Sequence, residues 1–354
     1  MTRLRIIIAS IASIIGFLLI LPLLIFSLPF WFVSCTHNWI YSIIRRFKPV
    51  PSSWGDLIEY HPVIGWKPKP KLDTFAKDMA GNSYSLTTDQ YGWRNGVIES
   101  EEKDVFVFGD SFAFGYGVND DEFFANVISN PCIRVIGANG YNMVQEYLLM
   151  ETYAPEIKNK MVIWFIYHGN DLYENLVPNL NRYRMPFLRE TSNSEGWEIV
   201  TRHVNPARWS ITTQREYKQE LADICSETLL SKRVFDACDF LIEKGKKTCE
   251  NQNAKLIIFS LPDVFQMDEN KIKELMSRSS NIETFDSEYP DKKLRDICEH
   301  HSIPFFTMKD YLTVDDFITN EIHWNKKGNK KVAELIKDIH MNDGVRSRDL
   351  YAYR

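Results

Sequence analysis

The sequence predicts an α/β protein in which a parallel sheet is covered by helices on both faces. From residue 104 onward, short apolar runs alternate with longer helical segments. The runs are continuously apolar, which is typical of strands that are buried on both faces of a parallel sheet. At 354 residues, with 44% hydrophobic and 25% charged residues, the chain is long enough to bury a sizeable core.

Ahead of the sheet, residues 49–103 are rich in Gly, Pro and short alternating runs, which indicates an irregular or β lead-in. Strands are expected at the apolar runs 104–108, 133–136, 161–167, 255–260 and 304–307. Helices are expected between or after them, at 122–129, 144–153, 215–251, 292–300 and 327–339.

The pattern divides the chain into an N-terminal membrane segment with a juxtamembrane helix (1–48), the lead-in (49–103), the α/β domain (104–340) and a C-terminal tail (341–354). Within the domain, residues 175–213 interrupt the alternation with Asn, Arg, Pro and Trp. We interpret this stretch as an insertion beside the carboxyl edge of the sheet, where loops commonly carry substrate contacts.

The N-terminal segment predicts one membrane-spanning helix and therefore contact with a lipid bilayer. Residues 6–33 contain no charge, and a span needs roughly 20 apolar residues. A cleaved signal peptide and a lipoprotein site with a lipidated Cys35 are alternatives, but we favour an uncleaved single-pass anchor. Residues 39–47 fit either an amphipathic helix on the head groups or a linker helix. Basic residues flank both sides of the span about equally, so they do not give its orientation.

Charge and cysteine spacing exclude several classes of function. A net charge of −5 and a pI near 6.0 give no electrostatic basis for nucleic-acid binding. The six cysteines form no CxxC pair, and no cluster of metal ligands is visible, so neither a metal nor a cofactor is expected. A disulfide between Cys238 and Cys249 remains open.

Chemistry-bearing residues follow three of the expected strands and precede the last helix. Ser111 follows the first strand, Gly140 the second and Asn170 the third, and His323 lies just before the final helix. Carboxyl ends of parallel strands share one edge of a sheet, so these residues can meet in one cleft. A simpler reading of the first segment is that Asp110 or Ser111 caps a helix.

Together these residue types provide the parts of a nucleophilic acyl-transfer site. A serine hydroxyl needs a neighbouring base, which His323 can supply to Ser111. The oxyanion that forms needs preorganised donors. Suitable donors are the backbone N–H groups of Ser111 and Gly140 and the side-chain amide of Asn170.

The sequence resembles the SGNH/GDSL hydrolase family. The resemblance is carried by Gly109-Asp110-Ser111, by Gly140, by Gly169-Asn170-Asp171, and by His323 with Trp324-Asn325 and Gly328. It implies a three-layer, flavodoxin-like α/β/α sandwich. It also implies Ser111 as nucleophile, His323 as base, Gly140 and Asn170 in the oxyanion hole, and Asp110 and Asp171 as supporting residues.

The same resemblance implies an acyl esterase or transferase that needs no cofactor. The expected substrate is an acylated carbohydrate or another small ester, and the expected acyl group is acetyl. Residues 61–66 and 91–94 look like the lead-in of membrane-anchored bacterial members, which implies a catalytic domain on the extracytoplasmic, periplasmic side.

One position departs from the family pattern. The family usually has Asp three residues before the catalytic His, and this chain has Asn320. Asn can orient an imidazole but cannot stabilise its charge, and the equivalent change in serine proteases costs about ten-thousandfold in turnover. Glu321 can replace the missing acid, Asp315 or Asp316 can reach over, or Ser111 and His323 can act as a dyad. We favour Glu321.

Two other functions compete with catalysis. The Asn320 departure allows a catalytically impaired domain that binds carbohydrate or ester without cleaving it. The pair Gly115 and Gly117 after the first strand allows a phosphate- or nucleotide-binding domain. Its spacing fits neither a P-loop nor the dinucleotide fingerprint.

Overall fold

The structure is a computed structural model that describes residues 54–94, 103–180, 183–192, 196–205 and 216–342. Ser52–Arg354 forms one compact unit, which includes the lead-in and the α/β domain. The expected membrane segment 6–33, the helix expected at 39–47 and Cys35 lie outside the described residues. None of the described helices is long and apolar enough to cross a bilayer.

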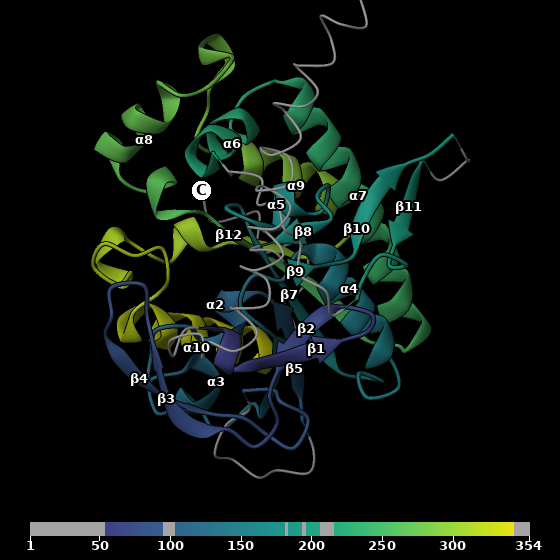
Figure 1. The fold of residues 1–354 in the computed structure, drawn as a ribbon, viewed down its shortest axis with the longest axis vertical. Helices are drawn as coiled ribbons and strands as arrows, with labels where there is room; N and C mark the ends of the chain where they lie inside the picture. Colours follow the sequence, from purple (N-terminus) through teal and green to yellow (C-terminus); the bar gives the residue numbers. More distant parts are fainter. Residues whose placement is uncertain (1–53, 95–102, 181–182, 193–195, 206–215, 343–354) are drawn as a thin grey trace, which may run out of the picture. The chain divides into compact units, whose positions relative to one another are not determined.

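A parallel sheet of five strands forms the centre of the fold (Figure 1). Its order is β13 (Phe305–Thr307), β12 (Lys255–Leu261), β7 (Met161–Tyr167), β5 (Val105–Gly109) and β6 (Ile133–Gly137). Numbered along the chain this is the order 2-1-3-4-5 of flavodoxin-like sheets, whose ligand sites lie where the strand order reverses. The reversal lies between β5 and β7. All five expected strands are confirmed.

Helices cover both faces of the sheet, so the three expected layers are present (Figure 1). One face packs against α4 (Met143–Thr152), α7 (Leu229–Asn251) and α9 (Tyr289–His300). The other packs against α2 (Ser111–Phe114), α3 (Phe124–Val127) and α10 (Lys326–Met341). Neighbouring residues of one strand serve opposite faces, as their alternation requires: Trp164 lies in the first core and Phe165 in the second.

The region expected to form one helix at 215–251 contains two helices. α6 (Tyr217–Ile224) ends before a turn, and α7 begins after Thr228. The Thr228 hydroxyl accepts a hydrogen bond from Ser231 N, while Ser231 Oγ donates back from its side chain to Thr228 O and accepts from Thr228 N. This capping box starts a new helix. The sequence reading missed α5 (Asp171–Glu174) and α8 (Glu269–Met276).

Both segments without strong helical pattern form small antiparallel hairpins. In the lead-in, β1 (Ile58–His61) pairs with β2 (Gly65–Pro68), and β3 (Asp73–Lys77) pairs with β4 (Ser83–Thr87). In the insertion, β8 (Asn179–Leu180) pairs with β9 (Tyr183–Arg184), and β10 (Phe187–Glu190) with β11 (Trp197–Val200). Short 3₁₀ turns complete the described elements: Trp54–Asp56, Val264–Gln266, Ile282–Thr284, Met308–Asp310 and Val314–Asp316.

The disulfide that the sequence left open between Cys238 and Cys249 is absent. Both cysteines are buried and free, and both lie on α7. Eleven residues of helix separate their Cα atoms by about 16 Å. A disulfide requires less than about 7 Å.

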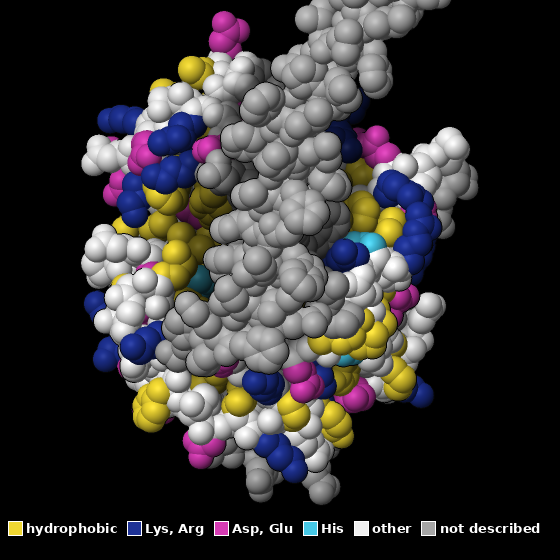
Figure 2. Space-filling model, in the orientation of Figure 1, with side chains coloured by type: hydrophobic (Ala, Val, Ile, Leu, Met, Phe, Trp, Pro, Cys, Tyr) yellow, Lys and Arg dark blue, Asp and Glu magenta, His cyan; other side chains and the backbone are white. Residues whose placement is uncertain are grey.

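On the part of the surface that Figure 2 shows, no large patch carries charges of only one sign. Lys and Arg side chains are interspersed with Asp and Glu. This mixture agrees with the modest net charge of −5.

Candidate active site

Ser111 stands at the turn between β5 and α2, where the chain passes from a buried strand to a helix. β5 ends at Gly109, and Asp110 caps α2 by accepting a hydrogen bond from Phe112 N at 2.9 Å. A side chain at Gly137 would clash with the carbonyl oxygen of Gly109, so glycine permits the close approach of β5 and β6 here. Ser111 itself is 9% exposed.

His323 lies between the serine and an acid. Its Nε2 is 2.8 Å from Ser111 Oγ, and its Nδ1 is 2.6 Å from Glu321 Oε2. All three side chains are buried. A hydroxyl, an imidazole and a carboxylate in this order have the geometry of a catalytic triad.

The loop before α10 explains how an acid only two residues from the histidine reaches its ring. Phe317 and Trp324 pair as an antiparallel bridge, and Ile318 N donates to His323 O at 2.9 Å. Inside this closed loop, Glu321 N donates to Ile318 O at 3.0 Å and Asn320 takes a left-handed φ of 60°. The tight loop turns the Glu321 carboxylate back toward the ring.

The structure places the other candidate acids and Asn320 away from the imidazole. Asn320 and Asp315 are exposed. Asp316 accepts hydrogen bonds from Thr313 and pairs with Lys331 at 2.6 Å. Of the acids weighed from the sequence, Glu321 is the one that contacts His323.

Gly140 follows β6 and Asn170 follows β7, the two strands that neighbour β5 in the sheet. Gly140 has a φ of 72°, a conformation that glycine adopts readily. The Asn170 amide donates to Tyr141 O at 2.8 Å and to Asp171 Oδ1 at 3.0 Å. Both amide hydrogens are thus engaged, and the first of these bonds ties the end of β7 to the loop that carries Gly140. Asp171 in turn accepts from Tyr167 N at 2.7 Å.

Ionisation at the site follows from burial and hydrogen bonding. Burial opposes the charge of Glu321, but hydrogen bonds from His323 and from Met79 N outweigh it and lower the pKa of Glu321. Burial raises the pKa of Asp110 to about 6, against the opposing effects of the Phe112 N–H and of His323. Burial also raises the pKa of Asp171 well above its ordinary value, aided by the carboxylates of Glu146 and Asp110.

Two site contacts were missed by the sequence reading. The ring of Tyr116 lies 4.5 Å from the ring of His323. Met79 N donates to Glu321 Oε1 at 3.2 Å. Tyr116 was within the motif that follows Ser111 and could have been found there. Met79 contributes its backbone N–H, which every residue except proline has, so the residue type does not indicate the contact.

His168, two residues before Asn170, belongs to a separate buried network. Its Nε2 is 2.7 Å from Ser260 Oγ, and its Nδ1 is 3.0 Å from Gln266 Oε1. Ser260 Oγ also donates to Asp291 Oδ1 at 2.7 Å. Burial lowers the pKa of His168 despite the nearby Asp291. The network is fully buried, so it supports the end of β7 and cannot meet a substrate.

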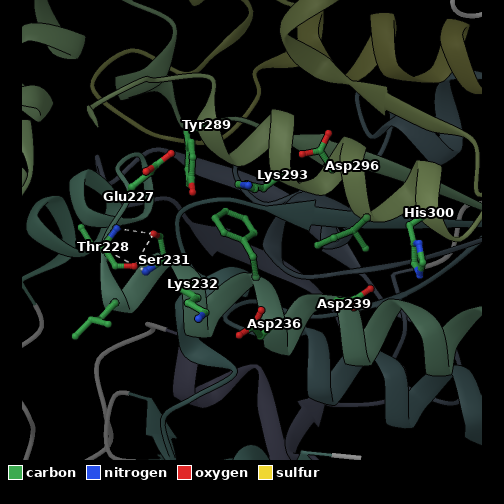
Figure 3. A pocket seen from close by; sticks show the side chains of 13 residues that line it. Glu227, Thr228, Ser231, Lys232, Asp236, Asp239, Tyr289, Lys293, Asp296 and His300 are labelled. Carbon is green, nitrogen blue, oxygen red and sulfur yellow. Dashed lines mark hydrogen bonds between the residues drawn. The ribbon is translucent and has the colours of Figure 1, made fainter. Parts of the chain in front are cut away.

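A hollow of about 780 Å³ lies away from this site, between α7 and α9 (Figure 3). Its walls mix aromatic and charged side chains, among them Phe235, Tyr289, Lys232, Lys293, Asp236 and Asp296. None of the catalytic candidates lines it. Within the described residues, no group of three or more His, Cys, Asp or Glu could hold a metal ion.

No protein-family model and no curated protein matches the sequence. Solved structures do match. One is a protein described as lipolytic and of the G-D-S-L family, from Desulfitobacterium hafniense, at 15% identity and a TM-score of 0.38, covering 67% of this chain and 99% of that one. Another is a carbohydrate acetylesterase family member from Sinorhizobium meliloti, at 12% identity and a TM-score of 0.38, covering 68% of this chain and 99% of that one. A third is the native aryl esterase of M. smegmatis, at 11% identity and a TM-score of 0.40, covering 69% of this chain and 100% of that one.

These neighbours are esterases and a lipolytic protein. At identities of 11–15% and TM-scores of 0.38–0.40, the likeness carries no argument about activity.

Proposed function

We propose that this protein is a serine acyl esterase of the SGNH type. The observation that carries the proposal is the continuous chain of contacts from Ser111 Oγ to His323 Nε2 at 2.8 Å and from His323 Nδ1 to Glu321 Oε2 at 2.6 Å. A serine that only capped a helix would need neither partner. A binding module would gain nothing from a buried hydroxyl, imidazole and carboxylate in this order.

In the acylation step, Ser111 Oγ attacks the carbonyl carbon of an ester. His323 Nε2 accepts the hydroxyl proton, and Glu321 stabilises the imidazolium that results. The carbonyl oxygen becomes an oxyanion, to which the N–H groups of Ser111 and Gly140 can donate hydrogen bonds. Ser111 is the first residue of α2, so its N–H has no acceptor within the helix.

The tetrahedral intermediate then collapses, and the bond to the leaving alcohol breaks. His323 gives its proton to the alcohol oxygen, and the acyl group stays on Ser111. In the second half, His323 takes a proton from water, the hydroxide forms a bond to the acyl carbon, and Ser111 Oγ leaves with the proton. A sugar hydroxyl in place of water would make the same site a transferase.

Asn170 enters the proposal in two ways. Its amide can join the oxyanion hole if it exchanges its bond to Asp171 Oδ1 for one to the oxyanion. In the resting geometry its bond to Tyr141 O holds the loop of Gly140 in place. Asp110 supports the site by capping α2, and Asp171 supports it by accepting a hydrogen bond from Asn170.

The substrate part of the proposal is a small acyl group, such as acetyl, on a carbohydrate or another small ester. It rests on the resemblance to bacterial SGNH hydrolases. We also propose that residues 6–33 anchor the chain in a membrane by one span, with the catalytic unit on the extracytoplasmic side. Extraction of membranes at alkaline pH tests the anchor: the full chain should stay in the pellet, and its release would contradict the anchor.

Hydrolysis of a chromogenic acetyl ester tests the enzymatic proposal. Ser111→Ala should lower the rate at least about a thousandfold, because the residual rate comes from binding and the oxyanion donors alone. Ser277→Ala removes an exposed hydroxyl at the C-terminal end of α8, outside both the site and the lead-in, and serves as the matched control. Equal rates for Ser111→Ala and the parent would overturn the assignment. An inactive parent that still binds acylated sugar would favour the non-catalytic binding module.

A further inference from the structure

We propose that the lead-in, residues 54–94, is a positioning element of the catalytic site and acts on the catalytic acid through the backbone N–H of Met79. The inference rests on the proposed function, because it assigns a role in the reaction to a segment outside the α/β domain. It is carried by hydrogen bonds from the lead-in to three separate parts of the site.

The first contact completes the hydrogen bonding of Glu321. Its Oε2 accepts hydrogen bonds from the ring Nδ1 of His323 at 2.6 Å and from the backbone N of His323 at 3.3 Å. Its Oε1 receives Met79 N at 3.2 Å. Glu321 is 5% exposed, and a buried carboxylate without donors is costly. The lead-in therefore supplies the donor to the second oxygen, and with it part of what keeps this acid ionised.

The β3–β4 hairpin holds the Met79 N–H in a fixed turn. Gly81 N donates to Asp78 O at 3.1 Å, which makes Met79 the second residue of a β-turn. Asp78 N donates to Asn82 O at 2.9 Å, and the Asp78 carboxylate accepts from Asn82 N and Nδ2 at 2.7 and 2.9 Å. The Met79 side chain is 74% exposed. The backbone is thus constrained while the side chain is free of the site.

The hairpin is itself tied to the segment that follows the nucleophile. Ser85 N donates to Asn119 Oδ1 at 2.9 Å, and Tyr116 OH donates to Lys77 O at 3.4 Å. The rings of Tyr84 and Tyr116 meet edge to face, 5.8 Å apart. Tyr116 also covers the ring of His323, so the hairpin contacts the acid directly and the base through one tyrosine.

The end of the lead-in fixes the loop after the nucleophile helix. Arg94 is fully buried and forms an ion pair with Asp120 at 3.0 Å. Its guanidinium also donates to the carbonyl oxygens of Gly115 and Val118. These bonds hold the chain directly after α2, which carries Ser111.

The middle of the lead-in fixes the loop of the oxyanion donor. Trp66 Nε1 donates to Asn139 O at 3.2 Å, and Tyr141 OH donates to Trp66 O at 2.8 Å. These bonds flank Gly140 on both sides. The lead-in thus contacts the nucleophile loop, the oxyanion loop and the acid, which are the three parts that must keep their relative positions during the reaction.

The Met79 contact can be removed without removing anything else. Proline lacks the backbone N–H, and its φ suits the second position of a β-turn. Met79 is not among the residues with positive φ, so a left-handed backbone does not exclude proline there. Met79→Ala is the matched control, because it shortens the same exposed side chain and keeps the N–H.

The experiment measures kcat and KM for a chromogenic acetyl ester on the full chain, with active sites counted by a fluorophosphonate probe. Counting reactive sites corrects for any loss of folded protein. Met79→Pro should lower kcat per site at least about tenfold with KM within twofold, because it removes a hydrogen bond to a charged carboxylate. Met79→Ala should match the parent. Asp78→Ala, which loosens the turn but keeps the N–H, should lower kcat several-fold.

The outcomes separate this inference from the proposed function. A parent that hydrolyses no ester and takes no probe would overturn the proposed function and this inference with it. A reactive parent with equal kcat per site for Met79→Pro and Met79→Ala would overturn the inference alone. A rise in KM with unchanged kcat would also contradict it, because the N–H would then serve substrate binding.

Discussion

Glu321 Oε2 lies 2.6 Å from His323 Nδ1, although a single residue separates the two in the chain. The loop between Phe317 and Trp324 closes on itself and returns the carboxylate to the ring. A carboxylate in this position stabilises an imidazolium, and an amide does not. In the proposed mechanism, Glu321, two residues before the histidine, takes the place of the acid expected three residues before it.

Glu321→Gln is expected to lower kcat between about 10²- and 10⁴-fold, because the amide can still orient His323 but carries no charge. Turnover of a chromogenic acetyl ester measures this. Asp315→Asn is the control, because Asp315 is exposed and does not contact the ring. If the two variants lose equal activity, Glu321 is not the acid of the site.

Asn320→Asp is expected to leave kcat within about twofold of the parent. Asn320 is exposed and left-handed, so a carboxylate placed there would point to solvent. Asp tolerates the left-handed conformation nearly as well as Asn, so the fold should not change. A tenfold gain in kcat would show that position 320 reaches His323 during catalysis and would contradict the geometry described above.

Asp110 predicts a pH dependence of stability. Its pKa is about 6 in the folded protein, raised mainly by burial, against an ordinary value of 3.8. The folded state then binds more protons than the unfolded state between these values, so stability falls as pH rises from about 4 to 6. The shift corresponds to about 3 kcal/mol.

Asp110→Asn removes this titration and keeps an acceptor at the cap of α2. Urea unfolding at pH 4 and pH 6 should therefore show the advantage of the parent over this variant shrinking by about 2 kcal/mol as pH rises, the part of the full shift that titrates between these two pH values. An advantage that grows with pH would mean that Asp110 is stabilised as a carboxylate in the folded state.

His168→Leu is expected to lower the free energy of unfolding by about 3 kcal/mol, because it removes the two buried hydrogen bonds that join the ring to Ser260 Oγ and Gln266 Oε1. Urea denaturation measures the loss. His300→Leu changes an exposed histidine and should stay within about 0.5 kcal/mol of the parent. If the two variants are equally stable, the buried network contributes nothing to folding.

Much of the fold was readable from the sequence because its strands are short, continuous apolar runs. The run at β7, Met161–Tyr167, is buried along its whole length and was predicted with its bounds. The single helix expected at 215–251 was wrong because the capping box at Thr228 restarts the helix within a region of uniform helical propensity. The helix α8 was missed although Asp268 caps it by accepting from Asn270 N and Lys271 N.

The site could be predicted only in part. Ser111 and His323, predicted to act together, lie in contact because the end of a strand and the start of a helix meet at one edge of the sheet. The placement of Gly140 and Asn170 in an oxyanion hole stays a prediction. The Met79 N–H and the Arg94 bonds to carbonyl oxygens could not be read, because they join backbone atoms to residues far away in the chain. The engagement of both Asn170 amide hydrogens also depends on the loop geometry.

Covalent labelling of the full chain by a fluorophosphonate probe, located by mass spectrometry, tests whether Ser111 is the nucleophile. We expect one rapid adduct on Ser111, absent in Ser111→Ala and much slower in His323→Ala, because the hydroxyl is reactive only beside the imidazole. Folded protein that takes no adduct on Ser111, or that is labelled equally fast without His323, would contradict it.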